Sequence, residues 1–139
     1  MQRIVIDTNV YIDWLNSGRY EELFFAPGTV KHLSSIVMME LWAGAFAPTD
    51  RKLLQGITRS FAAVGRLLLP TIAVYQDAGE VLRRLQVVRG YTARGTATLV
   101  NDVLIALSAR SIGATVITQN KRDYGAIRSI RPFQLRVVT

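Results

Sequence analysis

Hydrophobic and polar positions along the chain follow two patterns, short apolar runs and longer stretches with helical spacing. The short runs are rich in β-branched residues and predict strands at 3–7, 31–35, 67–69, 114–118 and 134–138. The longer stretches repeat apolar residues at every third or fourth position. They predict helices at 8–16, 36–45, 51–66, 71–88 and 99–112, and a short helical turn at 121–127.

Residues that favour helix ends support these boundaries. Gly18 and Gly113 follow two of the predicted helices, and glycine is the usual residue at a helix C-terminus. Thr49 or Asp50 is expected to cap the helix at 51–66. The stretch RGYTARGTAT at 89–98 is rich in Gly, Thr and Arg and is predicted to be a loop.

The alternation of strands and helices predicts the fold class. Strands separated by helices of this length form βαβ units, which build a mostly parallel sheet with helices on both faces. The sequence contains no linker, internal repeat or low-complexity segment, so one α/β domain over residues 1–139 is expected. Ligands of such sheets bind beyond the carboxyl ends of the strands.

Composition narrows the protein class. Half of the 139 residues are hydrophobic and 19% are charged, which is typical of a folded domain rather than a disordered chain. No cysteine is present, which excludes disulfides and thiolate zinc sites. No apolar run approaches the roughly 20 residues of a membrane span, and no signal peptide is visible. We therefore expect a cytoplasmic protein without a membrane partner.

The charge balance favours a polyanionic partner. Seventeen basic residues, fourteen of them arginine, exceed ten acidic ones and give a net charge of +7. Arginine has a planar fork that matches phosphate oxygens, and a positive field attracts nucleic acid. Charge alone is equally compatible with simple solubility, and it specifies no chemistry.

Four of the ten acidic residues stand out by position. Six occupy polar or helix-start surroundings and are expected at the surface: Asp13, Glu21, Glu22, Asp50, Asp77 and Glu80. Asp7 ends the first predicted strand, and Asp123 follows the strand at 114–118 by five residues. Glu40 and Asp102 lie on apolar faces, in what we predict to be first helical turns near the same sheet edge.

Each acid alone has an ordinary explanation. Asp7 could cap the first helix, and an acid in a first helical turn, such as Asp102, needs no further role. Together, four carboxylates at one edge would repel one another and raise each other's pKa, and basic residues do not adjoin each of them. A hard divalent cation resolves this repulsion, and a single histidine excludes a nitrogen-rich site. Mg²⁺ or Mn²⁺ is therefore predicted.

Acidic metal sites in basic proteins suit phosphodiester hydrolysis. Such ions can hold a phosphate and activate a water, while arginines hold the rest of the nucleic-acid backbone. Ser–His and Cys–His nucleophile systems are disfavoured by one histidine and no cysteine, and neither a Walker A nor a GxGxxG pattern occurs. Metal-assisted cleavage of nucleic acid is the predicted reaction class.

Four segments, VIDTNV, MMELWAGA, NDVLIALSA and ITQNKRDY, resemble in order the motifs of PIN-domain ribonucleases, in particular VapC-type toxins of toxin–antitoxin systems. The resemblance implies a three-layer α/β/α sandwich and Mg²⁺- or Mn²⁺-dependent cleavage of RNA. It further implies a homodimer and an antitoxin whose C-terminal segment blocks the site. The motifs imply that the catalytic metal ligands are Asp7, Glu40, Asp102 and Asp123, with Thr8, Asn9, Thr118 and Asn120 orienting them.

Two departures from the family pattern accompany the match. Tyr124 occupies a position where Phe is more usual, and the stretch before Asp102 is slightly long. Arg94, Lys121 and Arg122 are the basic residues nearest the motifs and are candidate RNA contacts, although isolated exposed charges explain them equally well.

Two alternatives remain open from the sequence. A non-catalytic PIN-like module would bind nucleic acid or a partner without cutting, and its signature would be a missing acid. A receiver-like phosphotransfer domain would need an acidic pair after its first strand, where this chain has Asp7-Thr8-Asn9.

Overall fold

The computed structural model describes residues 1–91 and 93–139, with side chains for all of these except 93–98. Its centre is a parallel sheet in the order β3-β2-β1-β4-β5. The strands are β1 (Gln2–Ile6), β2 (Thr29–Ser34), β3 (Leu67–Leu68), β4 (Thr115–Thr118) and β5 (Gln134–Val137). All five predicted strands are present, each within two residues of its predicted limits.

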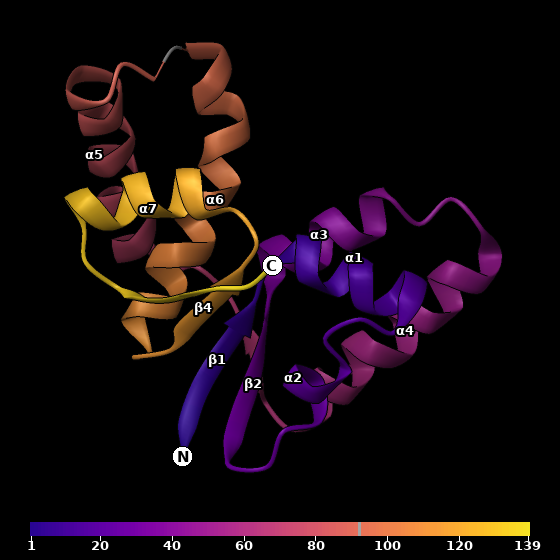
Figure 1. Cartoon of the computed structure of the whole chain (residues 1–139). Helices are drawn as coiled ribbons and strands as arrows, with labels where there is room; N and C mark the ends of the chain where they lie inside the picture. Colours follow the sequence, from indigo (N-terminus) through magenta and orange to yellow (C-terminus); the bar gives the residue numbers. More distant parts are fainter. Residues whose placement is uncertain (92) are drawn as a thin grey trace.

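The helices form two groups on either side of the sheet. Figure 1 shows α1 (Thr8–Ser17), α2 (Glu21–Phe25), α3 (Ser35–Ala43) and α4 (Pro48–Ala63) on one side of the strands. On the other side are α5 (Ile72–Val88), α6 (Ala93–Ser111) and α7 (Lys121–Ile130). The predicted three-layer α/β/α architecture with a parallel central sheet is therefore confirmed.

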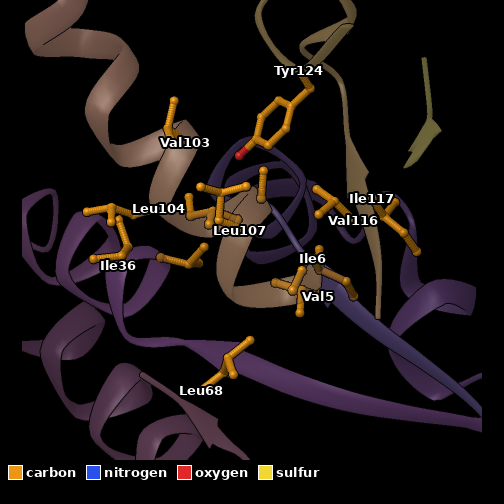
Figure 2. Packing of buried hydrophobic residues seen from close by; sticks show 14 of the residues in the cluster. Val5, Ile6, Ile36, Leu68, Val103, Leu104, Leu107, Val116, Ile117 and Tyr124 are labelled. Carbon is orange, nitrogen blue, oxygen red and sulfur yellow. The ribbon is translucent and has the colours of Figure 1, made fainter. Parts of the chain in front are cut away.

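The core lies where the central strands meet the helices. In Figure 2, Val5 and Ile6 of β1 lie near Val116 and Ile117 of β4, with Leu107 of α6 close by. These side chains are essentially inaccessible to solvent, as expected for central parallel strands covered on both faces. Burial of this apolar surface is the main force that fixes the sheet edge and the loops above it.

Glycine ends two helices as predicted. Gly18 follows α1 with φ of 74°, and Gly113 follows α6 with φ of 67°. Both values lie in the left-handed region, which side chains with a Cβ adopt only with strain.

Three helix predictions were wrong in extent. Helix α4 begins at Pro48 and is preceded by Ala47, so Thr49 and Asp50 lie in its first turn and do not cap it. Proline suits this position because its φ is already helical and its missing N–H has no intrahelical partner there. The helix also ends at Ala63, not at residue 66.

Helix α6 begins at Ala93, so most of the loop predicted at 89–98 is helical. The helix forms here despite the weak helix preference of the glycine and threonines in this stretch. Helix α7 continues three residues beyond the predicted turn, and α2, five residues long, was too short to be recognised from periodicity. Within the described residues, no helix combines the length and apolarity needed to cross a bilayer.

An ion pair links Arg131, which directly follows α7, to Asp77 of α5. The Arg131 guanidinium donates from Nη2 to Asp77 Oδ1 at 2.6 Å and from Nε to Oδ2 at 3.1 Å. Glu80 lies 3.8 Å from the same Nη2 atom. The two main partners are only 25% and 28% exposed, so water screens this two-bond contact less than an ordinary surface pair.

We predict that Arg131→Met lowers the free energy of unfolding by about 1–2 kcal/mol, because it leaves Asp77 without its bidentate partner. Urea unfolding followed by circular dichroism measures the change. Arg128→Met is the matched control, since Arg128 is exposed on α7 and forms no ion pair with a described residue. Equal losses in the two variants would contradict the prediction.

Candidate functional site

Asp7 lies at the junction of β1 and α1, above the middle of the sheet. Its N–H donates to Ile117 O of β4 at 2.9 Å, which holds the junction against the neighbouring strand. One carboxylate oxygen accepts from the Thr8 N–H at 2.8 Å and caps α1. The other accepts from the Thr118 hydroxyl at 2.7 Å and the Asn9 amide at 3.3 Å. Asp7 can therefore cap α1 with one carboxylate oxygen while the other faces Thr118 and Asn9 at the sheet edge.

Asp7 is a buried acid, with 4% of its surface exposed. Burial raises the pKa of Asp7 and the charge of Glu40 raises it further, while the hydrogen bonds from Thr118 and Thr8 lower it. The polar partners therefore offset part of the cost of placing this carboxylate inside the protein.

Thr118, the last residue of β4, connects the elements of the site. Its buried hydroxyl donates to Asp7 and accepts from the Asn120 N–H at 3.0 Å. The Asn9 amide lies 3.4 Å from the same oxygen. The predicted orienting residues Asn9, Thr118 and Asn120 therefore form one network around Asp7.

Glu40 reaches the same edge from α3. Its Oε1 accepts from the Thr8 hydroxyl at 2.7 Å, and its Oε2 lies 3.5 Å from the Asn101 amide on α6. Thr8 therefore joins Asp7, through its N–H, to Glu40, through its hydroxyl.

Asp102 and Asp123 are bridged by one amide. The Asn120 Nδ2 atom lies 3.4 Å from Asp102 Oδ2 and 3.0 Å from Asp123 Oδ2. Burial raises the pKa of Asp102 to about 7, and the charges of Asp7, Asp123 and Glu40 add to the rise. All four predicted carboxylates therefore lie close enough to interact.

The helical positions of two acids differ from the prediction. Glu40 is the sixth residue of α3, and Asp102 lies more than two turns inside α6. Neither occupies a first turn, so a favourable interaction with a helix N-terminus does not explain either carboxylate. Because α6 begins at Ala93, Asp102 is not in a first helical turn, and the helix N-terminus no longer explains its presence.

The four carboxylates have the oxygen atoms that a hard cation binds, but they do not surround a position for one. Their oxygens are the donors that Mg²⁺ and Mn²⁺ prefer, and a bound cation would offset the buried charge of Asp102 and its repulsion by the neighbouring carboxylates. Among the described residues, however, no three acidic or histidine side chains are grouped closely enough to hold an ion as they stand. The residues therefore fit a divalent ion in chemistry but not in spacing.

Tyr124 places a buried hydroxyl near Asp7 and Asp102. The side chain is fully buried, and its hydroxyl has no hydrogen-bond partner among the described residues. In Figure 2 the ring extends from its helix toward α6. Burial and the charges of Asp7 and Asp102 hold the pKa of Tyr124 well above its ordinary value, so the phenol stays neutral.

Sequence reasoning missed several polar contacts of the site. The Tyr91 hydroxyl donates to Asp123 Oδ1 at 3.0 Å; burial first, then this bond, raises the pKa of Tyr91. The Asn101 amide faces Glu40, and its place beside Asp102 in the NDVLIALSA segment was the available signal. Tyr91 gave no signal, because it fell in a predicted loop.

Gln119 clamps the loop between β4 and α7. Its Nε2 atom donates to Asp13 Oδ2 at 2.7 Å and to the Tyr20 hydroxyl at 3.2 Å. Its N–H donates to the Asn9 side-chain oxygen at 3.3 Å. Asp13, predicted at the surface, is half-buried because Gln119 and Arg19 hold it.

The predicted RNA contacts are only partly described. Lys121 and Arg122 are exposed in the first turn of α7, next to Asp123. Arg94 falls among the residues whose side chains the structure does not describe.

Comparison with known proteins extends these observations. Residues 4–128 match the profile of a family described as "PIN domain". No curated protein matches the sequence.

Solved structures share the fold over essentially the full chain. A chain of VapBC2 from Rickettsia felis, bound to promoter DNA, is 22% identical with a TM-score of 0.70, covering 99% of this chain and 100% of that one. A chain of VapBC-1 from nontypeable Haemophilus influenzae is 21% identical with a TM-score of 0.71, covering 98% of each. A chain of VapBC-5 from Mycobacterium tuberculosis is 25% identical with a TM-score of 0.65, covering 99% and 100%.

The raised pKa of Asp102 predicts an unusual pH dependence of stability in metal-free protein. The folded state keeps this carboxyl protonated up to about pH 7, whereas its ordinary pKa is 3.8. The folded state therefore binds more protons than the unfolded state between these values, so the Asp102 contribution to stability falls as pH rises through that window.

We expect Asp102→Asn to be more stable than the unmodified protein in EDTA, with an advantage that grows between pH 5 and pH 8 to at most about 4 kcal/mol. Urea unfolding at the two pH values measures it. Asp50→Asn, which neutralises an exposed acid on α4, is the control for charge loss. An advantage of Asp102→Asn that does not grow with pH would contradict the prediction.

Proposed function

Because the chain belongs to the PIN-domain family, we propose that it is a divalent-metal-dependent endoribonuclease and the toxin of a toxin–antitoxin pair. Family membership confirms the resemblance drawn from the four sequence motifs. The observation that carries the proposal is the network of Asp7, Glu40, Asp102 and Asp123, linked through Thr8, Thr118 and Asn120. We take residues 1–139 as one nuclease domain.

In this proposal, Asp7, Glu40 and Asp102 would hold Mg²⁺ or Mn²⁺ once their side chains move closer together, and Asp123 would complete the set. A bound ion of this kind supplies an activated water and neutralises charge on phosphate oxygens. Burial, and after it the charges of Asp7, Asp123 and Glu40, raises the pKa of Asp102, and a bound cation would offset the charge of this carboxylate.

The surrounding residues would keep the carboxylates in place. Thr118 and Thr8 occupy one oxygen each of Asp7 and of Glu40 with short hydrogen bonds, which fixes the direction in which the remaining lone pairs point. Asn120 does the same for Asp102 and Asp123 through one amide. These hydrogen bonds lower the free-energy cost of placing four negatively charged carboxylates beside one phosphate group.

The proposed partners follow from charge and from the similar structures. A net charge of +7 suits an RNA substrate. The similar chains come from VapBC complexes, and by analogy this chain would bind a cognate antitoxin and form a homodimer in the cytoplasm. These assignments rest on likeness of fold and motif, and the nuclease assignment rests also on the carboxylate network.

We expect Asp7→Asn to abolish Mg²⁺- and Mn²⁺-dependent cleavage of total RNA while the fold is retained, since asparagine can still cap α1. The loss should reach at least about 100-fold, because removing the partner of a metal ligand alone costs 10–100-fold. Mapping of RNA ends after incubation with each ion, with and without EDTA, measures it.

Glu22→Gln is the matched control, because Glu22 is an exposed acid on α2 away from the network. Cleavage by Asp7→Asn at the unmodified rate would overturn the ligand assignment. If the unmodified protein cuts no RNA with either ion, the chain is a non-catalytic binding module of the PIN fold.

A further inference from the structure

A pocket of about 470 Å³ is lined in part by Tyr91, whose hydroxyl donates to Asp123. We call it the basic pocket. It is lined by Arg89, Tyr91, Arg122, Gly125 and Ala126. Its walls come from the end of α5, the residues that follow it, and the first two turns of α7.

The basic pocket is joined directly to the carboxylate network. The Tyr91 hydroxyl donates to Asp123 Oδ1 at 3.0 Å, while the other Asp123 oxygen contacts Asn120. One tyrosine therefore lines the pocket and fixes the nearest carboxylate. An anion bound in this pocket would therefore lie next to the residue that holds Asp123.

Two arginines of the pocket lack an anionic partner. Arg89 and Arg122 are both exposed, and neither forms an ion pair with a described residue. Asp123, although adjacent to Arg122 in sequence, is held by Tyr91 and Asn120. Two guanidinium groups on one pocket repel each other unless an anion lies between them, and their forked donors match phosphate oxygens.

Gly125 leaves the backbone of α7 bare where it lines the pocket. Gly125 lies inside α7, where glycine costs about 1 kcal/mol relative to alanine. A Cβ at this position would meet no atom within 4 Å, and the backbone φ is not positive. Neither packing nor backbone conformation requires glycine here, whereas a ligand that approaches the helix backbone would.

We propose that the basic pocket is the subsite for an RNA phosphate adjacent to the scissile one, with Arg89 and Arg122 as its ligands and Tyr91 as a positioning residue. The inference rests on the proposed nuclease function, and it specifies where the RNA strand lies next to the carboxylate network. The ligand is a backbone phosphodiester, so the subsite reads charge and spacing but not base identity.

The test measures binding separately from cleavage. A fluorescently labelled, unstructured RNA decamer is titrated with full-length Asp7→Asn protein in Mg²⁺, at several salt concentrations, and affinity is followed by anisotropy. Adding Arg89→Ala and Arg122→Ala together should weaken binding several-fold. The slope of log K against log salt should fall by about 0.7 for each arginine removed.

Arg59→Ala in the same background is the charge-matched control, because Arg59 is exposed on α4 and has no ion pair with a described residue. Gly125→Met tests the pocket without changing charge. It should also weaken binding and reduce the slope, while thermal unfolding verifies that α7 is intact.

The outcomes separate the two proposals. If the Arg89 and Arg122 substitutions leave affinity and salt slope equal to those of Arg59→Ala, the subsite is wrong, whether or not the unmodified protein cuts RNA. If the unmodified protein cuts no RNA with Mg²⁺ or Mn²⁺ but the pocket variants lose affinity, the nuclease function is wrong and the phosphate site remains.

Discussion

The hydrogen bond between Thr118 and Asp7 ties together the parts of the molecule on which the site depends. It spans 2.7 Å and joins residues 111 positions apart. It is possible only because β1 and β4 are parallel neighbours, so that their carboxyl ends meet at one edge. The chain passes from β1 to β2 and β3 on one side and returns to β4 on the other. Ligands of open α/β sheets bind at this reversal of strand order, and Asp7 lies there.

The second constraint is electrostatic. Burial and three neighbouring carboxylates raise the pKa of Asp102 to about 7, so the fold holds these groups together against their repulsion. Burial of the apolar core around β1, β4 and α6 supplies the free energy that offsets this repulsion. Hydrogen bonds from threonine and asparagine side chains stabilise the buried carboxylates further. Ionising a carboxyl in such a site lowers the stability of the fold, and such a loss of stability is common at functional sites.

Much of the fold and the four acids could be predicted from the sequence. Apolar runs located the strands, Gly18 and Gly113 marked helix ends, and the acids stood out because apolar neighbours or strand ends surrounded them. The start of α6 could not be predicted, since the glycine and threonines of this stretch locally disfavour a helix. The hydrogen bond from Tyr91 to Asp123 and the pocket beside it could not be predicted either. They depend on how the end of α5 meets α7, and no local pattern encodes that meeting.

The wide sequence separation of the site residues has a consequence during synthesis of the chain. Asp7 and Glu40 emerge from the ribosome long before Asp102, Thr118 and Asp123, whereas the sheet edge exists only after β4 has paired with β1. Contacts between distant segments form late, because their loop-closure entropy must be overcome first. A nascent chain that ends before β4 therefore carries three of the four acids without the network that gathers them. Any chemistry of this site therefore requires that synthesis has passed Asp123.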